Sequence, residues 1–427
     1  MADQNNKNVD ALAQEITLKS RGQGKLRQFI LWMGALIIGA ILGWQHIPVL
    51  NDLFNFIAAV FTHLFQFIAI PTVSLAVITT LSMLGAKKDT GRIFGHAVTY
   101  TLLTTICAAA VGLGLFLWIA PGNLPLDVIG AGAAQVPEKL GHVTYYDHFL
   151  SVIPNNILKP YLEGNVLSVM FISASVGLAF AFMPRTEGRE AVLKVLFGLQ
   201  ELLFTLIKAL LYVLPIGILA FAGQLSAQIE AGVIVGALGK YTAVVIGGNL
   251  IQFFIVIPLF LLFRGLNPLD VFRKMSPAVA VTLASAEDNL KAHPSVARFV
   301  LPICTTINMN GCAAFILVTS LFVMQNAGIE LTMGTMIAWL FIAVLAAIGN
   351  AGVPMGCYFL TLSLMSSIGA PIGLLGIILP IYTIIDMIET AENVWSDASV
   401  CAMVDNDLKG TLDDTDSHDD MPQFQGA

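Results

Sequence analysis

The segment IIDMIETAENVWSD, residues 384–397, lies inside an apolar stretch that extends from residue 372 to residue 404. About 20 apolar residues cross the hydrocarbon core of a bilayer, so this stretch is long enough to span it. A charge at the bilayer centre costs on the order of 3 kcal/mol or more, so charged side chains there normally face protein or a wet cavity. The sequence therefore predicts a membrane-spanning helix with a polar interior face. Four carboxylates lie in it: Asp386, Glu389, Glu392 and Asp397.

Most polar residues of this segment share one side of the predicted helix. Each residue turns by about 100°, so Glu389 lies about 60° from Asp386, whereas Glu392 lies about 120° away. Glu392 is therefore expected at the membrane interface or in a structural role. Residues 299–408 contain no Lys or Arg, so we expect cations from solution to neutralise the acids, and oxygen ligands suit a hard cation such as Na⁺. The stripe comprises Asp386, Glu389, Thr390, Asn393 and Asp397.

The composition of the whole chain agrees with a membrane protein. Of 427 residues, 56% are hydrophobic and 11% are charged, against about 25% charged in a typical soluble domain. These values exclude an ordinary cytosolic enzyme, a nucleic-acid-binding protein and a disordered chain. The net charge is −7, and most of it lies in the acidic tail, residues 405–427. The five cysteines show no paired spacing, so neither a disulfide framework nor a zinc site is expected.

Hydropathy predicts eight transmembrane helices and two broken apolar segments. The polar N-terminal segment, residues 1–27, shows no cleavable signal peptide. Bases precede the first span and follow the second, fourth and sixth, which places both termini in the cytoplasm. The pair Gly39 and Gly43 could allow close helix packing, although chance in a glycine-rich span is the simpler interpretation. The spans are 28–45, 53–84, 94–119, 165–183, 197–223, 241–263, 299–325 and 372–404, and the broken segments are 268–297 and 334–370.

Polar and glycine-rich interruptions mark three further places in the last part of the chain. Residues 305–311, TTINMNG, predict local unwinding inside the seventh span, where free carbonyls can coordinate ions. Residues 347–354, AIGNAGVP, predict a re-entrant tip because Pro354 prevents a continuous helix. Residues 283–290, LASAEDNL, suggest a second tip. On composition alone, each tip could instead be a simple loop.

Together these pieces resemble the dicarboxylate/amino acid:cation symporter family, which includes the glutamate transporters. Residues 308–311, Asn-Met-Asn-Gly, are similar to the family's Asn-Met-Asp-Gly motif, and residues 349–354 are similar to its second hairpin tip. Asp386, Thr390, Asn393 and Asp397 match its final-helix pattern. The resemblance extends over residues 28–404.

The resemblance implies an all-α integral membrane protein with eight transmembrane helices and two re-entrant helical hairpins. It implies a homotrimer that works by an elevator motion in the inner or plasma membrane. The symporter domain, residues 28–404, would contain a scaffold formed by 28–84 and 165–223. Its moving transport part would comprise 94–119 and 241–404.

The resemblance also implies roles for individual residues. Asp386 would bind the substrate ammonium, and Asn393 would bind its carboxylate. The other substrate-contacting residues would be Glu389, Thr390, Cys312, Ser285, Ala286, Gly352 and Val353. One sodium site would comprise Asp397 with Cys304, Asn308 and Asn393. A second sodium site would comprise Thr306, Ala347, Ile348 and Asn350. A third sodium site of the family would correspond to Asn310, Thr104 and Thr105.

Departures from the family pattern bear on the substrate. Members with acidic substrates carry an arginine where this chain has Glu389, which would repel a second carboxylate. We therefore expect cation-coupled symport, with Na⁺ or H⁺, of a small amino acid that is neutral or polar, and no organic cofactor. The alternative is a dicarboxylate or acidic amino acid, for which Lys291 or Arg298 would be the available base. A membrane enzyme is disfavoured because neither His-Glu-x-x-His nor Gly-x-Ser-x-Gly is present; a channel or sensor is the remaining rival.

Overall fold

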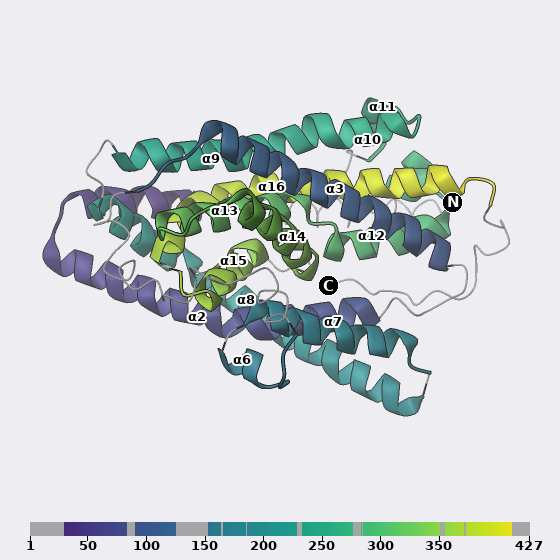
Figure 1. The fold of residues 1–427 in the computed structure, drawn as a ribbon, viewed down its shortest axis with the longest axis horizontal. Helices are drawn as coiled ribbons and strands as arrows, with labels where there is room; N and C mark the ends of the chain where they lie inside the picture. Colours follow the sequence, from purple (N-terminus) through teal and green to yellow (C-terminus); the bar gives the residue numbers. More distant parts are fainter. Residues whose placement is uncertain are drawn as a thin grey trace, which may run out of the picture. The chain divides into compact units, whose positions relative to one another are not determined.

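A computed structural model of the chain describes residues 30–82, 90–124, 153–163, 165–184, 186–228, 233–275, 283, 285–350, 355–370 and 373–411. Within these ranges the secondary structure is helical and no strand is present (Figure 1). A first helix covers Ile30–Trp44. The labelled helices are α2 (Pro48–Ser82), α3 (Thr90–Ile119), α6 (Lys159–Glu163), α7 (Val166–Phe182), α8 (Glu187–Gln228), α9 (Val233–Ile251), α10 (Ile257–Phe263), α11 (Pro268–Met275), α12 (Pro294–Ile307), α13 (Asn310–Asn326), α14 (Met333–Gly349), α15 (Gly356–Ser367) and α16 (Gly373–Leu408), with the π-helices η4 (Gln252–Val256) and η5 (Ser285–Leu290).

Several of these helices have the length and hydropathy of membrane spans. In the described part, five helices are long enough and apolar enough to cross a membrane: Pro48–Thr79, Gly91–Ile119, Glu187–Gln224, Gly236–Phe263 and Pro294–Asn326. A sixth is added if Gly373–Leu379 and Ile384–Leu408, which are bent by 75° to each other, count as one span. Three shorter apolar helices, Ile30–Trp44, Ser168–Phe182 and Met333–Gly349, fall below the length limit. The helical membrane class is confirmed, and the count of eight spans stays a prediction.

The chain divides into two compact units. One contains Met1–Leu64, Lys208–Ile229 and Gly376–Thr383, and the other contains Phe65–Ile207, Glu230–Leu375 and Ile384–Ala427. The predicted division into a scaffold and a transport part follows other boundaries and remains a prediction.

Two glycines bring helices of the smaller unit into direct backbone contact. A Cβ on Gly39 would lie 2.2 Å from the carbonyl oxygen of Leu219, and one on Gly43 would lie 2.1 Å from that of Gly223. No side chain larger than hydrogen fits at either position. The preferred interpretation of this pair as a chance occurrence is therefore wrong, because both glycines lie at a close helix crossing.

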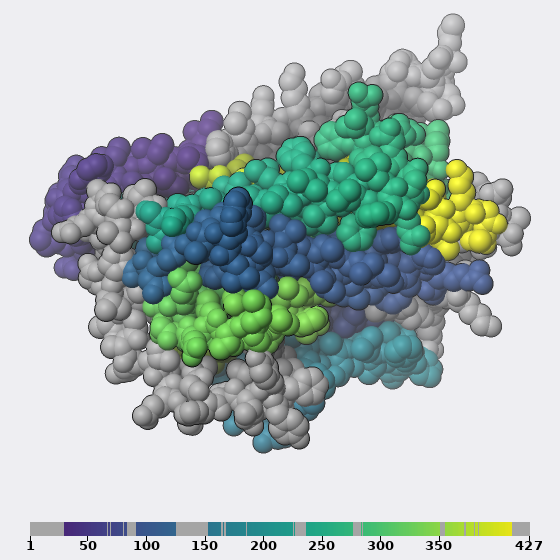
Figure 2. All heavy atoms as spheres, turned by 45° about the horizontal axis from the view of Figure 1, so that its top comes forward, coloured from purple at the N-terminus to yellow at the C-terminus, as the bar shows by residue number. Residues whose placement is uncertain are grey.

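Helix α13 forms the centre of the larger unit. It is apolar on all sides and buried along almost its whole length, as expected for a helix surrounded by others. It packs against α3, α9, α14 and α15. Figure 2 shows one face of this unit, where α9, α3 and α14 lie side by side.

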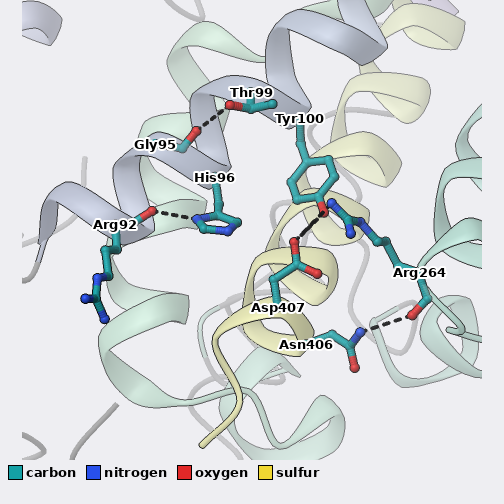
Figure 3. Close-up of polar contacts among 8 residues, drawn as sticks. All are labelled: Arg92, Gly95, His96, Thr99, Tyr100, Arg264, Asn406 and Asp407. Carbon is teal, nitrogen blue, oxygen red and sulfur yellow. Dashed lines mark hydrogen bonds and ion pairs between the residues drawn. The ribbon is translucent and has the colours of Figure 1, made fainter. Parts of the chain in front are cut away.

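The C-terminal end of α16 is held by a polar cluster (Figure 3). The Tyr100 hydroxyl donates a hydrogen bond to Asp407 Oδ2, and Arg264 Nη2 lies 3.4 Å from the same oxygen. The Arg264 guanidinium lies 5.2 Å from the centre of the Tyr100 ring. Asn406 Nδ2 donates to the Arg264 carbonyl oxygen at 3.0 Å. These contacts fix the end of α16 to α3 and to the end of α10.

Candidate ion and substrate site

The predicted unwinding inside the seventh span is confirmed. Helix α12 ends at Ile307 and α13 begins at Asn310. Between them Asn308 has φ −96° and ψ 65°, and Met309 has φ −104° and ψ 68°. The break turns the side chain and backbone of Asn308 into the buried interior of the larger unit.

Five predicted ion ligands meet at this break in one hydrogen-bonded cluster. Asn308 Nδ2 donates to Asp397 Oδ1 at 2.9 Å. Asn310 Oδ1 accepts from Thr105 Oγ1 at 2.7 Å and from Thr104 Oγ1 at 3.3 Å. All five side chains are buried. Elements far apart in the sequence, α3, the α12–α13 break and α16, thus supply one polar centre.

Ser396 completes this cluster, although its sequence position alone did not predict it as a ligand. Its hydroxyl oxygen accepts from Asn308 Nδ2 at 2.9 Å and from Asn310 Nδ2 at 2.6 Å. Its position beside Asp397 in the polar segment was the available signal. Cys304 contributes its carbonyl oxygen, which accepts from the Asn308 amide at 2.9 Å.

A second group of predicted residues gathers around Cys312. Asn350 Nδ2 lies 3.3 Å from Cys312 Sγ, and Asn393 Nδ2 lies 3.8 Å from it. Asn393 Oδ1 accepts from the Gly311 amide at 3.0 Å. The carbonyl oxygen of the buried Asn350 side chain has no hydrogen-bond partner in the described part of the chain. Asn393 therefore lies between the Cys312 group and the α12–α13 break.

Cys312 and Cys357 form a disulfide, contrary to the expectation of no disulfide. They are 45 residues apart and lie on α13 and α15, so no local spacing pattern marks them. A carboxylate oxygen of Glu389 and the two sulfurs lie within 4.8 Å of one another. Because metal binding by cysteine requires thiolates, the oxidised pair supplies no metal ligand.

Glu389 is buried beside this disulfide without a compensating charge. Its side chain is 1% exposed, and neither carboxylate oxygen has a hydrogen-bond partner among the described residues. Asp386 is one turn away and partly buried, whereas Thr390 is exposed and its hydroxyl donates to the Asp386 carbonyl at 2.7 Å. The substrate end of the predicted stripe is thus acidic.

The remaining predicted residues within the described ranges lie on other parts of the larger unit's helices. Thr306 Oγ1 donates to the Ile303 carbonyl at 2.7 Å. The Ala347 carbonyl accepts from the Asn350 amide at 3.1 Å, and Ile348 precedes the end of α14. Ser285 and Ala286 are buried in η5, a π-helical turn that covers most of the predicted second tip. Gly352 and Val353 lie outside the described residues.

Arg298, one of the two bases considered for an acidic substrate, is already paired. Its Nε donates to Glu287 Oε1 at 2.7 Å and its Nη2 donates to Glu287 Oε2 at 3.1 Å. In this bidentate pair, Glu287 occupies the guanidinium N–H groups that could otherwise bind a substrate carboxylate.

Glu392 differs most from expectation. It is fully buried, so of the two expected roles the one at the membrane interface is excluded and the structural one remains. Neither of its carboxylate oxygens has a hydrogen-bond partner among the described residues. Asn249, which no sequence pattern marked as a site residue, lies close by at Gly311.

The model of the "Sodium:dicarboxylate symporter family" matches residues 29–407. Glt-6 of Caenorhabditis elegans, provisionally named a sodium-dependent excitatory amino acid transporter, is 25% identical and covers 96% of this chain and 86% of its own length. The L-cystine uptake protein TcyP of Bacillus thuringiensis is 27% identical and covers 90% of this chain and 89% of its own length. An excitatory amino acid transporter of Onchocerca volvulus is 25% identical, over 90% of each.

The match covers almost the whole chain, including every described helix that contributes to the polar clusters. Members of this family are symporters, which move solutes and catalyse no covalent reaction. The protein is therefore an integral membrane transporter that belongs to the sodium:dicarboxylate symporter family.

Proposed function

We propose that this protein is a secondary active transporter that couples inward movement of Na⁺ to uptake of a small amino acid with a neutral or polar side chain. The observation that carries the substrate class is the buried carboxylate of Glu389. A substrate's second carboxylate would meet a like charge there, which disfavours acidic cargo.

The clusters suggest how substrate and ion share the site. Asp386 would pair with the substrate ammonium, and Asn393 would bind the α-carboxylate. Asp397, which accepts a hydrogen bond from Asn308, would hold Na⁺ near the unwound carbonyls of the α12–α13 break. Each positive charge moved inward would contribute about 2.3 kcal/mol per 100 mV of membrane potential. A proton in place of Na⁺ is the alternative coupling ion.

The proposal includes the architecture that the resemblance implies. Adding Ile30–Trp44 and Ser168–Phe182 to the five long helices and the bent pair would give the eight spans. Two re-entrant hairpins, an elevator motion and a homotrimer complete it. A native mass of three 45.7 kDa chains in detergent would support the trimer, and a monomeric or dimeric mass would contradict it.

Two other substrates are supported by specific observations. The family description and the names of two relatives favour a dicarboxylate or an acidic amino acid. The TcyP relative is named for L-cystine, which carries two ammonium groups and would offer partners to both Asp386 and Glu389. Competition for uptake distinguishes these two substrates from a small neutral amino acid.

The test is uptake of radiolabelled serine into proteoliposomes that contain the purified chain, with and without an inward Na⁺ gradient. Unlabelled alanine, threonine, cystine, aspartate and succinate are the competitors. We expect Na⁺-driven accumulation that alanine and threonine inhibit and that aspartate and succinate do not.

Uptake that persists unchanged without Na⁺ and without a proton gradient would contradict coupled transport. Strong inhibition by aspartate or succinate would instead contradict the substrate class while leaving coupling intact. Empty liposomes provide the control for leakage.

A further inference from the structure

Glu392 is a buried acid that the site described above does not use. Its side chain is fully buried, and neither oxygen has a hydrogen-bond partner in the described part of the chain. The two donors that face it are committed elsewhere: the Gly311 amide donates to Asn393 and the Asn310 amide donates to Ser396. An unpaired carboxylate in such surroundings is costly unless a cation compensates it.

A second unpaired oxygen points to the same place from another helix. Asn249 on α9 is 1% exposed, and its Nδ2 donates to the Val245 carbonyl at 2.9 Å. This bond directs Oδ1 away from its own helix, and Oδ1 has no partner among the described residues. A Cβ built on Gly311 would lie 2.5 Å from Asn249 Oδ1 and 2.8 Å from Glu392 Oε2. Two buried acceptors from different helices thus converge on Gly311, where only a glycine leaves room for both.

No neighbouring base explains this convergence. The other charged groups that act on Glu392 are Glu389 and Asp397, and both are acidic. The ion pairs within the described residues join other acids to their bases. Two acceptors that lie this close repel each other unless a cation or a proton lies between them.

We propose that Asn249 Oδ1 and Glu392 Oε2 coordinate a Na⁺ ion that is separate from the ion assigned to Asp397. One carboxylate and one amide carbonyl form an oxygen pair of the kind that a hard monovalent cation prefers. This inference rests on the proposed function, because it adds a coupling ion to the same transport cycle.

The local structure of α9 supports an ion at this position. Gln252 lies one turn after Asn249, and its Nε2 donates to the Thr104 carbonyl at 3.0 Å, while its buried Oε1 has no partner in the described part. The π-helix η4 begins at this residue, and such insertions are frequent at functional sites.

The test measures Na⁺ binding without any substrate. Thermal unfolding of the purified full-length protein is followed at rising NaCl, with choline chloride keeping the ionic strength constant. We expect Glu392→Gln and Asn249→Leu each to raise the half-saturating Na⁺ concentration by about tenfold or more. Gly311→Ala, which places a methyl group at the point of convergence, should have the same effect. Glu330→Gln, at an exposed acid, is the matched control.

A second readout is the number of Na⁺ ions moved per serine, obtained from the reversal potential in proteoliposomes. Glu392→Gln should lower this number by one. If the wild-type protein moves serine with Na⁺ and this variant keeps both the ratio and the Na⁺ titration, the extra site is overturned and the proposed function stands. A wild-type protein without Na⁺-driven uptake would instead overturn the proposed function.

Two further outcomes decide the assignment. A difference between wild type and Glu392→Gln that follows external pH and persists without Na⁺ would overturn the Na⁺ assignment. If Glu392→Gln does not fold, Glu392→Asp, which keeps the carboxylate, should retain Na⁺-dependent stabilisation that Asn249→Leu loses.

Discussion

We expect Glu389 to determine which side chains the substrate site tolerates. Its buried carboxylate lies beside the Cys312–Cys357 disulfide with no partner among the described residues. A like charge in such a site costs several kcal/mol. Glu389→Gln is therefore expected to strengthen inhibition of serine uptake by aspartate by about tenfold or more, with alanine changed by less than about twofold. Competition curves measure both ratios.

The exposed acid Glu330 provides the control for this substitution. Glu330→Gln should leave both inhibition constants at their wild-type values. An aspartate constant that does not change in Glu389→Gln would show that this carboxylate does not face the substrate.

Asp397 is expected to carry most of the Na⁺ dependence of uptake. It is buried, and the neutral amide of Asn308 donates a hydrogen bond to it. Asp397→Asn removes the negative charge but keeps an oxygen of similar position, so folding should survive. We expect the half-saturating Na⁺ concentration for serine uptake to rise by about tenfold or more.

The surface pair of Asp270 and Lys274, at 2.8 Å, supplies the comparison for a lost aspartate charge. Asp270→Asn should leave the Na⁺ titration unchanged, because exposed pairs contribute little. A normal titration in Asp397→Asn would remove Asp397 from the ion site.

At the residue scale, helical periodicity predicted some features and could not predict others. The turn angle placed Asp397 and Asn393 on one face, and both are buried in the larger unit. The same angle placed Glu392 on another face. A single helix does not reveal whether that face meets lipid or a neighbour, and here it meets Asn249 of α9.

At the element scale, the backbone contact of Gly39 and Gly43 is the clearest determinant of packing in the smaller unit. A methyl group at either position would overlap the backbone of α8 at Leu219 or Gly223. Overpacking at such a contact costs about 1–3 kcal/mol. Gly39→Ala and Gly43→Ala should therefore lower the thermal unfolding temperature in detergent.

Gly34 lies on the same helix and is a matched control, because a Cβ at this position would meet nothing within 4 Å. Gly34→Ala should leave the unfolding temperature unchanged or raise it, because alanine favours the helix. Equal effects of all three substitutions would show that helix propensity, and not the crossing, determines stability.

The interruptions of helices were easier to predict than their contacts. A polar run that ends in glycine predicted the break between Ile307 and Asn310, since its side chains and glycine disfavour a continuous apolar helix. The π-helix η4 carries no comparable composition signal, whereas η5 lies within the polar stretch 283–290 that suggested a tip. The partners of Asn310 across the break are Thr105 and Ser396, which lie more than 80 residues away from it in sequence. No local sequence pattern encodes such contacts.

At the scale of the whole molecule, the few charges are predicted to separate into those that orient the chain and those that serve the transport site. The bases cluster beside the predicted first, second, fourth and sixth spans, whereas the interior acids lie on α16. Hydropathy and this charge pattern together predicted eight spans. Helix length alone gives five or six, because Ile30–Trp44 and Ser168–Phe182 are short for a bilayer.

Reporter fusions distinguish these counts. An even number of spans returns the C-terminal end to the side of the N-terminus, and the base-rich loops should remain in the cytoplasm. Alkaline phosphatase fused after Asn123 should be active, and fusions after Lys88, Arg189 and Lys409 should be inactive. Green fluorescent protein at the same four positions should give the opposite pattern, which controls for expression. An active phosphatase after Lys409 would mean an odd number of spans, and the final helix, with its four acids, would then cross the membrane in the opposite direction.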